Sequence, residues 1–211
     1  MKGKRFDFIS FTIAIINIIA ALIVTNYLPK EIPMHYNIYG QADRIAGKAE
    51  FFYFSFVPMI LFLIFYLLTY TDKRLKEDFK PYWIICRGAI LLIIIAQYSM
   101  LLSINSNSFK SQLLIEAIGA ALILMGIYIP RLKQNTVAGF RLPWTLKDEE
   151  NWKATHRFGG RLSIVIGFIS IITGLILPVK YGFVVIFTII ILWTIAIVVY
   201  SYLYYRKNKI K

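Results

Sequence analysis

FDFISFTIAIINIIAALIVTNYL, residues 6–28, is the predominantly apolar run that decides the class of this protein. A helix needs about 20 such residues to cross the hydrocarbon core of a membrane. The run follows Lys2, Lys4 and Arg5, as the core of a signal peptide would. However, it exceeds the roughly 7–15 apolar residues of a signal peptide, and no A-x-A cleavage pattern follows. We therefore expect a retained first membrane span.

Further apolar runs of similar length recur along the chain, at 51–70, 82–104, 111–130, 162–178 and 183–205. Of the 211 residues, 58% are hydrophobic and 17% are charged, whereas soluble domains have about 45–50% apolar and about 25% charged residues. The runs lack the apolar–polar alternation of barrel strands. We predict an all-α polytopic membrane protein, a bundle of six transmembrane helices.

Lys and Arg residues indicate which ends of the spans face the cytoplasm. Eighteen of the 24 lie at the two termini and on the second and fourth connections, five lie on the other connections, and Arg87 lies within a span. This bias predicts cytoplasmic N- and C-termini. We expect an N-terminal module, 1–110, with an external loop, 29–50, and a C-terminal module, 111–211, with a cytoplasmic loop, 131–161. Because this topology accounts for the net charge of +13, we expect no direct binding of nucleic acid.

Within the predicted spans we single out Asn17, Arg87 and Glu116, because polar and above all ionisable residues there are candidates for function. The spans that carry Arg87 and Glu116 enter the membrane from opposite faces. The two side chains should therefore be about 15 Å apart, and we expect no direct salt bridge between them. Arg87 either extends to the cytoplasmic face or meets Asp7. Glu116 either serves packing or lines an outward-facing pocket, within reach of Arg44, Lys48 or His35.

The cytoplasmic stretch 139–161 has the pattern of a short capped helix. Thr145 is placed to cap its N-terminus, with acidic residues in the first turn and His156 and Arg157 in the last. A glycine pair should end the helix, which we predict over 146–158. This stretch then has three possible roles. It is an interfacial helix, with Trp144 and Trp152 among lipid headgroups and with Arg141, Arg157 and Arg161 against lipid phosphate. Alternatively, it is a docking surface for a cytoplasmic partner, or it is a plug that seals the bundle.

The chain offers little for catalysis. It has one cysteine, Cys86, and two distant histidines, with no HxxxH or CxxC pattern and no nucleophile–base pair. The Glu149–Glu150 pair invites comparison with intramembrane proteases that use two glutamates followed by an arginine, but residue 154 is alanine. We expect no enzyme, no metal and no cofactor.

Two stretches resemble a known family. One is the pattern formed by Asn135, Gly139, Arg141, Pro143, Trp144, Thr145, Trp152, Arg157, Gly159 and Gly160, which is similar to the signature of the SdpI-like immunity proteins, bacterial six-span proteins. Leu142 departs from it, where a small polar residue is expected. The other is the external segment with Pro33, His35, Asn37, Gly40 and Asp43, which resembles the N-terminal domain of uncharacterised function often joined to that signature.

The resemblance implies residence in the bacterial cytoplasmic membrane and protection of the producer from an exported toxic peptide, the sporulation-delaying toxin. It also implies signalling, in which the toxin-engaged protein holds a cytoplasmic transcriptional repressor at the membrane. The expected partners are the lipid bilayer, a toxic peptide outside and a repressor inside. Two other functions remain open. One is a small transporter, for which a dimer of the six-span chain would suffice, and the other is an envelope-stress sensor.

Overall fold

The computed structural model describes residues 6–37, 39, 41–76, 79–102, 104 and 112–209. Within these residues, six helical segments are long and apolar enough to cross a membrane, which confirms the predicted fold class. They are α1 (Phe8–Tyr27), α2 with α3 (Ala49–Phe54 and Val57–Leu68), α4 (Phe79–Leu101), α5 (Gln112–Tyr128), α6 (Glu149–Ile176) and α7 (Val179–Lys209). Two 3-10 turns, η1 (Lys73–Lys76) and η2 (Ile129–Arg131), precede α4 and follow α5.

The second span is broken between α2 and α3. Pro58 near the start of α3 has no N–H to donate to the preceding turn, and the Ser55 N–H bonds to Phe52 instead of continuing the α-helical pattern. Backbone carbonyls freed within a membrane need other donors. Asn17 and Gln97 supply them, as described below.

The first connection, which the sequence predicts only as an external loop, contains a β-hairpin. Strands β1 (Glu31–Tyr36) and β2 (Ala42–Gly47) pair antiparallel. Ile32 of β1 is buried against Ala21 and Phe51, which seats the hairpin on α1 and α2. Asn37 forms the hairpin turn by accepting the Tyr39 and Gln41 N–H groups on its side-chain oxygen.

Helices α5 and α6 approach each other through glycines. A Cβ atom at Gly119 would lie 2.6 Å from the carbonyl oxygen of Gly167, and one at Gly126 would lie 2.5 Å from that of Gly160. Only residues without a side chain allow two helices to come this close, which is a common arrangement in membranes. This antiparallel pair is the most closely packed contact of the bundle.

Helix α6 runs without interruption through the glycine pair that we expected to end it, so the prediction of a separate helix over 146–158 is wrong. A Cβ atom at Gly160 would lie 2.5 Å from Pro130, and one at Gly159 would lie 2.5 Å from the Phe140 ring. The glycines therefore make room for neighbours instead of stopping the helix.

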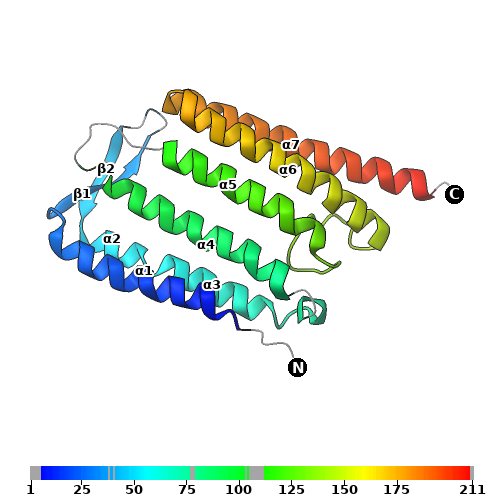
Figure 1. Ribbon diagram of the computed structural model, residues 1–211, viewed down its shortest axis with the longest axis horizontal. Coiled ribbons are helices and arrows are strands. Elements are labelled where there is room, and N and C mark those ends of the chain that lie inside the picture. The colour runs from blue at the N-terminus through cyan, green and yellow to red at the C-terminus, as the bar shows by residue number, and fades with distance from the viewer. Residues whose placement is uncertain are drawn as a thin grey trace.

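The hairpin lies at one end of the bundle, whereas α1 begins and α7 ends at the other (Figure 1). The loop 132–148, between η2 and α6, lies at the end where α7 finishes. This grouping agrees with the arrangement of the charged connections in the sequence. The assignment of that end to the cytoplasm, and the division into two modules, remain predictions.

Candidate functional site

The loop 132–148 is built around Asn135, which is almost fully buried. Its side-chain oxygen accepts hydrogen bonds from the N–H groups of Val137 and Ala138, at 2.8 and 2.7 Å, and its amide donates to the carbonyl of Lys133. An asparagine side chain that binds its own backbone in this way fixes a turn. Asn135 thus sets the direction in which the chain leaves η2.

His156 holds the next part of the loop against α6. Its Nε2 accepts the N–H of Phe140 at 3.0 Å and its Nδ1 donates to the carbonyl of Trp152 at 2.8 Å, so the ring is neutral with its proton on Nδ1. The ring is fully buried and stacks on the Trp152 indole with centroids 3.9 Å apart. Gly139 has a φ of +114°, and a Cβ there would lie 2.3 Å from His156 Nε2. Only glycine fits this position.

Trp152 and Thr145 are also buried, and both bind backbone groups. The Trp152 indole N–H donates to the carbonyl of Leu132 at 2.8 Å. The Thr145 hydroxyl accepts the N–H of Leu142 at 2.9 Å and donates to the carbonyl of Phe140. Thr145 is therefore not the helix cap that we expected, because its hydroxyl is committed to the loop. Asp148 caps α6 instead, accepting the N–H groups of the first turn.

Trp144 joins the loop to α7 rather than lying free among headgroups. Its indole N–H donates to the Ser201 hydroxyl at 2.7 Å, and its ring contacts those of Tyr202 and Tyr205. Ser201 also belongs to a buried polar cluster with Asn151 and Thr155 of α6. Sequence reasoning missed these three residues, although Asn151 and Thr155 are four residues apart and so share one helix face.

Asp72, on the connection before α4, was missed as well. Its carboxylate accepts the N–H and hydroxyl of Thr136, at 2.9 and 3.1 Å, and the N–H of Arg74 at 2.8 Å. Burial pushes the pKa of the Asp72 carboxyl upward, but these hydrogen bonds outweigh burial and hold its pKa below the ordinary value. Arg74 adds a bond from its guanidinium to the carbonyl of Gln134. The loop is thus tied to the N-terminal half of the bundle.

The remaining residues of the signature lie at the surface or between helices. Arg141, Pro143 and Arg157 are exposed, and the Arg141 guanidinium donates to the carbonyl of Thr136 at 2.7 Å. Gly160 lies in the α5–α6 contact already described. The signature therefore consists of buried residues that shape the loop and a few exposed residues that a partner or lipid can reach.

At the opposite end, the hairpin brings together two of the residues expected in the external loop. His35 Nδ1 lies 2.6 Å from Asp43 Oδ1, and both side chains are exposed. Pro33 pairs with Ile45 across the strands, and Asn37 forms the turn. Gly40 lies outside the described residues.

Glu116 does not have the partners that we suggested. His35 binds Asp43, Arg44 forms an ion pair with Glu50 at 2.8 Å, and Lys48 donates to the carbonyl of Leu28. Glu116 itself is half-buried on α5, beside Gly174 of α6. Its side chain therefore packs along the α5–α6 contact rather than under the charged residues of the hairpin.

The other two intramembrane polar residues form well-defined contacts. Arg87 Nη2 lies 3.0 Å from both carboxylate oxygens of Asp7, which is one of the two alternatives that we left open. Asn17 donates to the carbonyl of Ser55, at the break between α2 and α3, and to the side chain of Gln97 at 3.2 Å. Gln97 in turn donates to the carbonyl of Phe51. Gln97 is fully buried and was not singled out from the sequence.

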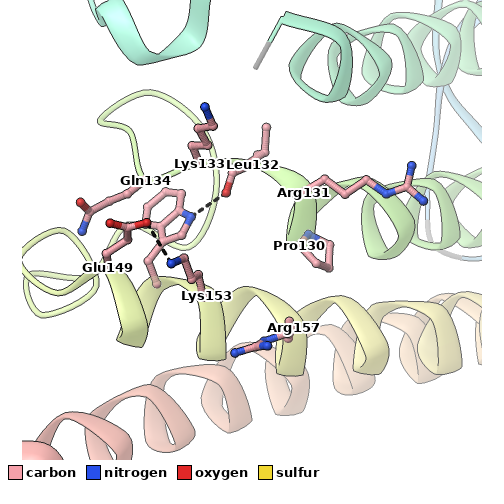
Figure 2. Close-up of a pocket in the computed structure, with 9 residues that line it drawn as sticks. Pro130, Arg131, Leu132, Lys133, Gln134, Glu149, Lys153 and Arg157 are labelled. Atoms are coloured by element: carbon pink, nitrogen blue, oxygen red, sulfur yellow. Dashed lines mark hydrogen bonds and ion pairs between the residues drawn. The ribbon is translucent and has the colours of Figure 1, made fainter. Parts of the chain in front are cut away.

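A cavity of 290 Å³ opens where η2 meets the start of α6 (Figure 2). The Trp152–Leu132 hydrogen bond and the 3.0 Å ion pair between Lys153 and Glu149 cross it. The described residues contain no group of three or more His, Cys, Asp or Glu side chains able to hold a metal ion. Exposed cations, among them Arg131, Lys153 and Arg157, line this cavity together with hydrogen-bonding groups.

Comparison with known proteins matches both halves of the chain. The family model described as SdpI/YfhL protein family matches residues 131–201, and that of a domain of unknown function, DUF1648, matches residues 12–62. The chain is 30% identical over 206 residues to the immunity protein SdpI of Bacillus subtilis (strain 168), and the match covers 95% of this chain and 96% of that protein. No solved structure matches the chain. The resemblance inferred from the two sequence patterns is confirmed.

Proposed function

The chain belongs to the SdpI/YfhL protein family, and on this premise we propose that it is a membrane immunity protein that protects its producer from an exported toxic peptide. The observation that carries the proposal is the similarity to an immunity protein over nearly the whole length of both chains. Six apolar helices and the similarity to a bacterial immunity protein make it a multi-pass protein of a bacterial membrane. The proposal involves no catalytic step, cofactor or metal.

The β-hairpin is the surface that we assign to the toxic peptide. It lies at the end predicted to be outside, and nearly all of β2 is exposed. The paired His35 and Asp43 side chains and the Arg44–Glu50 ion pair present charge and hydrogen-bonding groups on this surface. Ile32 anchors the hairpin in the bundle, so its outer face is held in a defined position.

Expression in a bacterium sensitive to the sporulation-delaying toxin tests the proposal. Cells with the native chain in their membrane should survive toxin that kills cells with the empty vector. The variant His35→Ala/Asp43→Ala should protect less, whereas Arg206→Ala, an exposed change at the other end of the bundle, should protect fully. Killing of cells whose membranes contain the native chain would refute immunity to this toxin. Full protection by the hairpin variant would refute only the role of the hairpin.

A finer proposal is that the protein also signals by recruiting a cytoplasmic transcriptional repressor. The support is the family resemblance together with the exposed face of the loop 132–148, which carries Arg141, Pro143, Leu146 and Lys147. Buried hydrogen bonds hold this face in one shape, as a docking surface requires. Trp152, which one interpretation of the sequence placed among lipid headgroups, is only 1% exposed and can contact neither lipid nor a repressor.

Membrane recruitment of a fluorescently tagged candidate repressor from the same bacterium tests the signalling proposal. Arg141→Ala/Lys147→Ala should reduce recruitment while leaving the amount of protein in the membrane unchanged. Lys207→Ala, on the exposed end of α7, serves as the control. Recruitment that is equal in all three proteins would place the repressor elsewhere or remove it from the mechanism.

Transport gains less support from the structure. A transporter path through both Arg87 and Glu116 would need the two side chains on one surface. Arg87 instead binds Asp7 at the start of α1, and Glu116 lies against α6. Each of these contacts is explained by packing between neighbouring helices.

A further inference from the structure

One face of α6 changes from cationic to apolar along a single line. Arg157, Arg161, Val165, Phe168 and Ile172 follow one another at intervals of three or four residues, so they share one side of the helix. All five are exposed, and Val165, Phe168 and Ile172 are each more than half exposed. The remaining faces of α6 are largely buried against α5, α7 and the loop 132–148.

Two cavities flank Arg157 at the cationic end of this line. The first is the 290 Å³ cavity between η2 and α6, whose lining includes Arg131, Lys153 and Arg157 (Figure 2). The second has a volume of 320 Å³ and lies between α6 and α7, lined by Ala154, Arg157, Phe158, Arg161, Tyr200 and Tyr204. Both are at the lower end of the size range of small-molecule sites, which suits a headgroup better than a peptide.

Only some of the cationic side chains that line these cavities form ion pairs with carboxylates. Lys153 is paired with Glu149 and Glu150, at 3.0 and 3.1 Å, and Figure 2 shows its ammonium directed at Glu149. Within the part of the chain that the structure describes, no carboxylate lies within ion-pair distance of Arg157 or Arg161. Arginine is the side chain best suited to bind phosphate, because its N–H groups match two phosphate oxygens at once.

The level of these arginines relative to the membrane follows from the helix. Arg161 and Val165 are one turn apart, about 6 Å along the axis, and the apolar part of α6 begins between them. The second cavity is lined by Tyr200 and Tyr204, and the Arg131 guanidinium lies over the Tyr128 ring. Aromatic residues are enriched at the headgroup level in this way. The two arginines are therefore placed at the depth of lipid phosphates.

We propose that the surface formed by Arg157, Arg161 and their two flanking cavities binds the phosphate headgroup of an anionic phospholipid, with an acyl chain lying along Val165, Phe168 and Ile172. Basic pockets between transmembrane helices are suited to such headgroups. The apolar continuation of the cationic end distinguishes this ligand from free phosphate and from an acidic peptide, neither of which would use it. The inference is independent of the proposed immunity function.

Native mass spectrometry of the full-length protein in detergent, after exposure to equal amounts of phosphatidylglycerol and phosphatidylcholine, tests the proposal. The native chain should retain phosphatidylglycerol in preference. Arg157→Gln/Arg161→Gln should lower the retained phosphatidylglycerol roughly tenfold or more, because each basic residue near a lipid phosphate contributes substantially to binding. The matched control, Arg206→Gln/Lys207→Gln, removes two exposed charges at the same end of the bundle and should retain the lipid as the native chain does.

Three results would overturn the proposal: equal retention of both lipids by the native chain, equal loss in the control variant, or displacement of the lipid by millimolar inorganic phosphate. The second would mean general surface charge, and the third would mean a site for phosphate alone. If the double variant does not fold, Arg161→Gln by itself carries the same comparison, because this side chain is exposed.

Discussion

Asp72 accepts both the backbone N–H and the hydroxyl of Thr136, at 2.9 and 3.1 Å, and so joins the connection before α4 to the loop before α6. Replacement by asparagine keeps the size of the side chain but removes its charge and one acceptor. We expect Asp72→Asn to lower the free energy of unfolding by about 1–3 kcal/mol. Thermal unfolding of the purified protein in detergent measures this. The exposed Glu150→Gln is the control, and an equal effect of the two changes would contradict the assignment.

The same carboxylate predicts a dependence of stability on pH. Because the pKa of Asp72 is lower in the folded protein than its ordinary value of 3.8, the ionised form stabilises the fold above that value, and the stabilisation is lost as the pH falls through the folded-state pKa. The difference in melting temperature between the native chain and Asp72→Asn should be constant above about pH 5 and shrink below about pH 4. A difference that grows on acidification would contradict this.

Gly139 is predicted to be intolerant of any side chain. An alanine there would combine an unfavourable φ of +114° with a Cβ 2.3 Å from His156 Nε2, so the loop would have to leave α6. We expect Gly139→Ala to cost at least about 2 kcal/mol of stability. Gly47→Ala is the control, because a Cβ there has its nearest neighbour at 4.0 Å. Similar melting temperatures for the two variants would show that the loop adapts.

The close contact of α5 and α6 at their glycines predicts that a larger side chain at Gly119 lowers the stability of the protein. Valine at position 119 would force the backbones of α5 and α6 apart at Gly167, whereas valine at the adjacent Ala120, which is exposed, would meet lipid. We expect Gly119→Val to lower stability by about 1–3 kcal/mol or more and Ala120→Val to change it little. Unfolding in detergent compares the two. Equal stability would mean that the helices are less closely held than described.

Asn17 and Gln97 are predicted to act together at the break between α2 and α3. Each single change to alanine should destabilise the protein, because it leaves a buried carbonyl of Ser55 or Phe51 without its donor. Their mutual hydrogen bond should give a coupling energy of about 0.6 kcal/mol in a double-mutant cycle. Asn26→Ala, an exposed asparagine on α1, is the control. Strictly additive single changes would argue against the direct bond.

The spans could be predicted from the sequence because each one is a long apolar run, a local property. The Arg87–Asp7 contact could also be predicted, because the depth of each residue in the membrane follows from its distance to the end of its span. The β-hairpin could not, because its short strands contain a proline and lack a regular alternation of apolar residues. The position of the hairpin depends on the packing of Ile32 against Ala21 and Phe51, which a single sequence does not reveal.

The candidate site was only partly predictable for a related reason. The residues of the signature were identified, but their roles depend on partners far along the chain, such as Ser201 for Trp144 and Leu132 for Trp152. Gly160 was interpreted as a helix terminator because its neighbour, Pro130, lies on another element. Asp72 was missed because nothing local distinguishes an aspartate that binds a distant backbone from one that faces solvent. Gln97 lies within the predicted span 82–104, so its polarity there was a signal that could have identified it.

The glycines of α5 and α6 have one more consequence. Gly119 and Gly126 are separated by seven residues, as are Gly160, Gly167 and Gly174. Sliding α6 by seven residues, about 10 Å, would therefore bring Gly126 opposite Gly167 and Gly119 opposite Gly174. Small-residue spacing by itself thus allows two alignments of the helix pair. The hydrogen bonds from Trp152 to Leu132 and from Phe140 to His156 exist in only one of them, so the buried part of the loop fixes the register of the membrane-embedded pair.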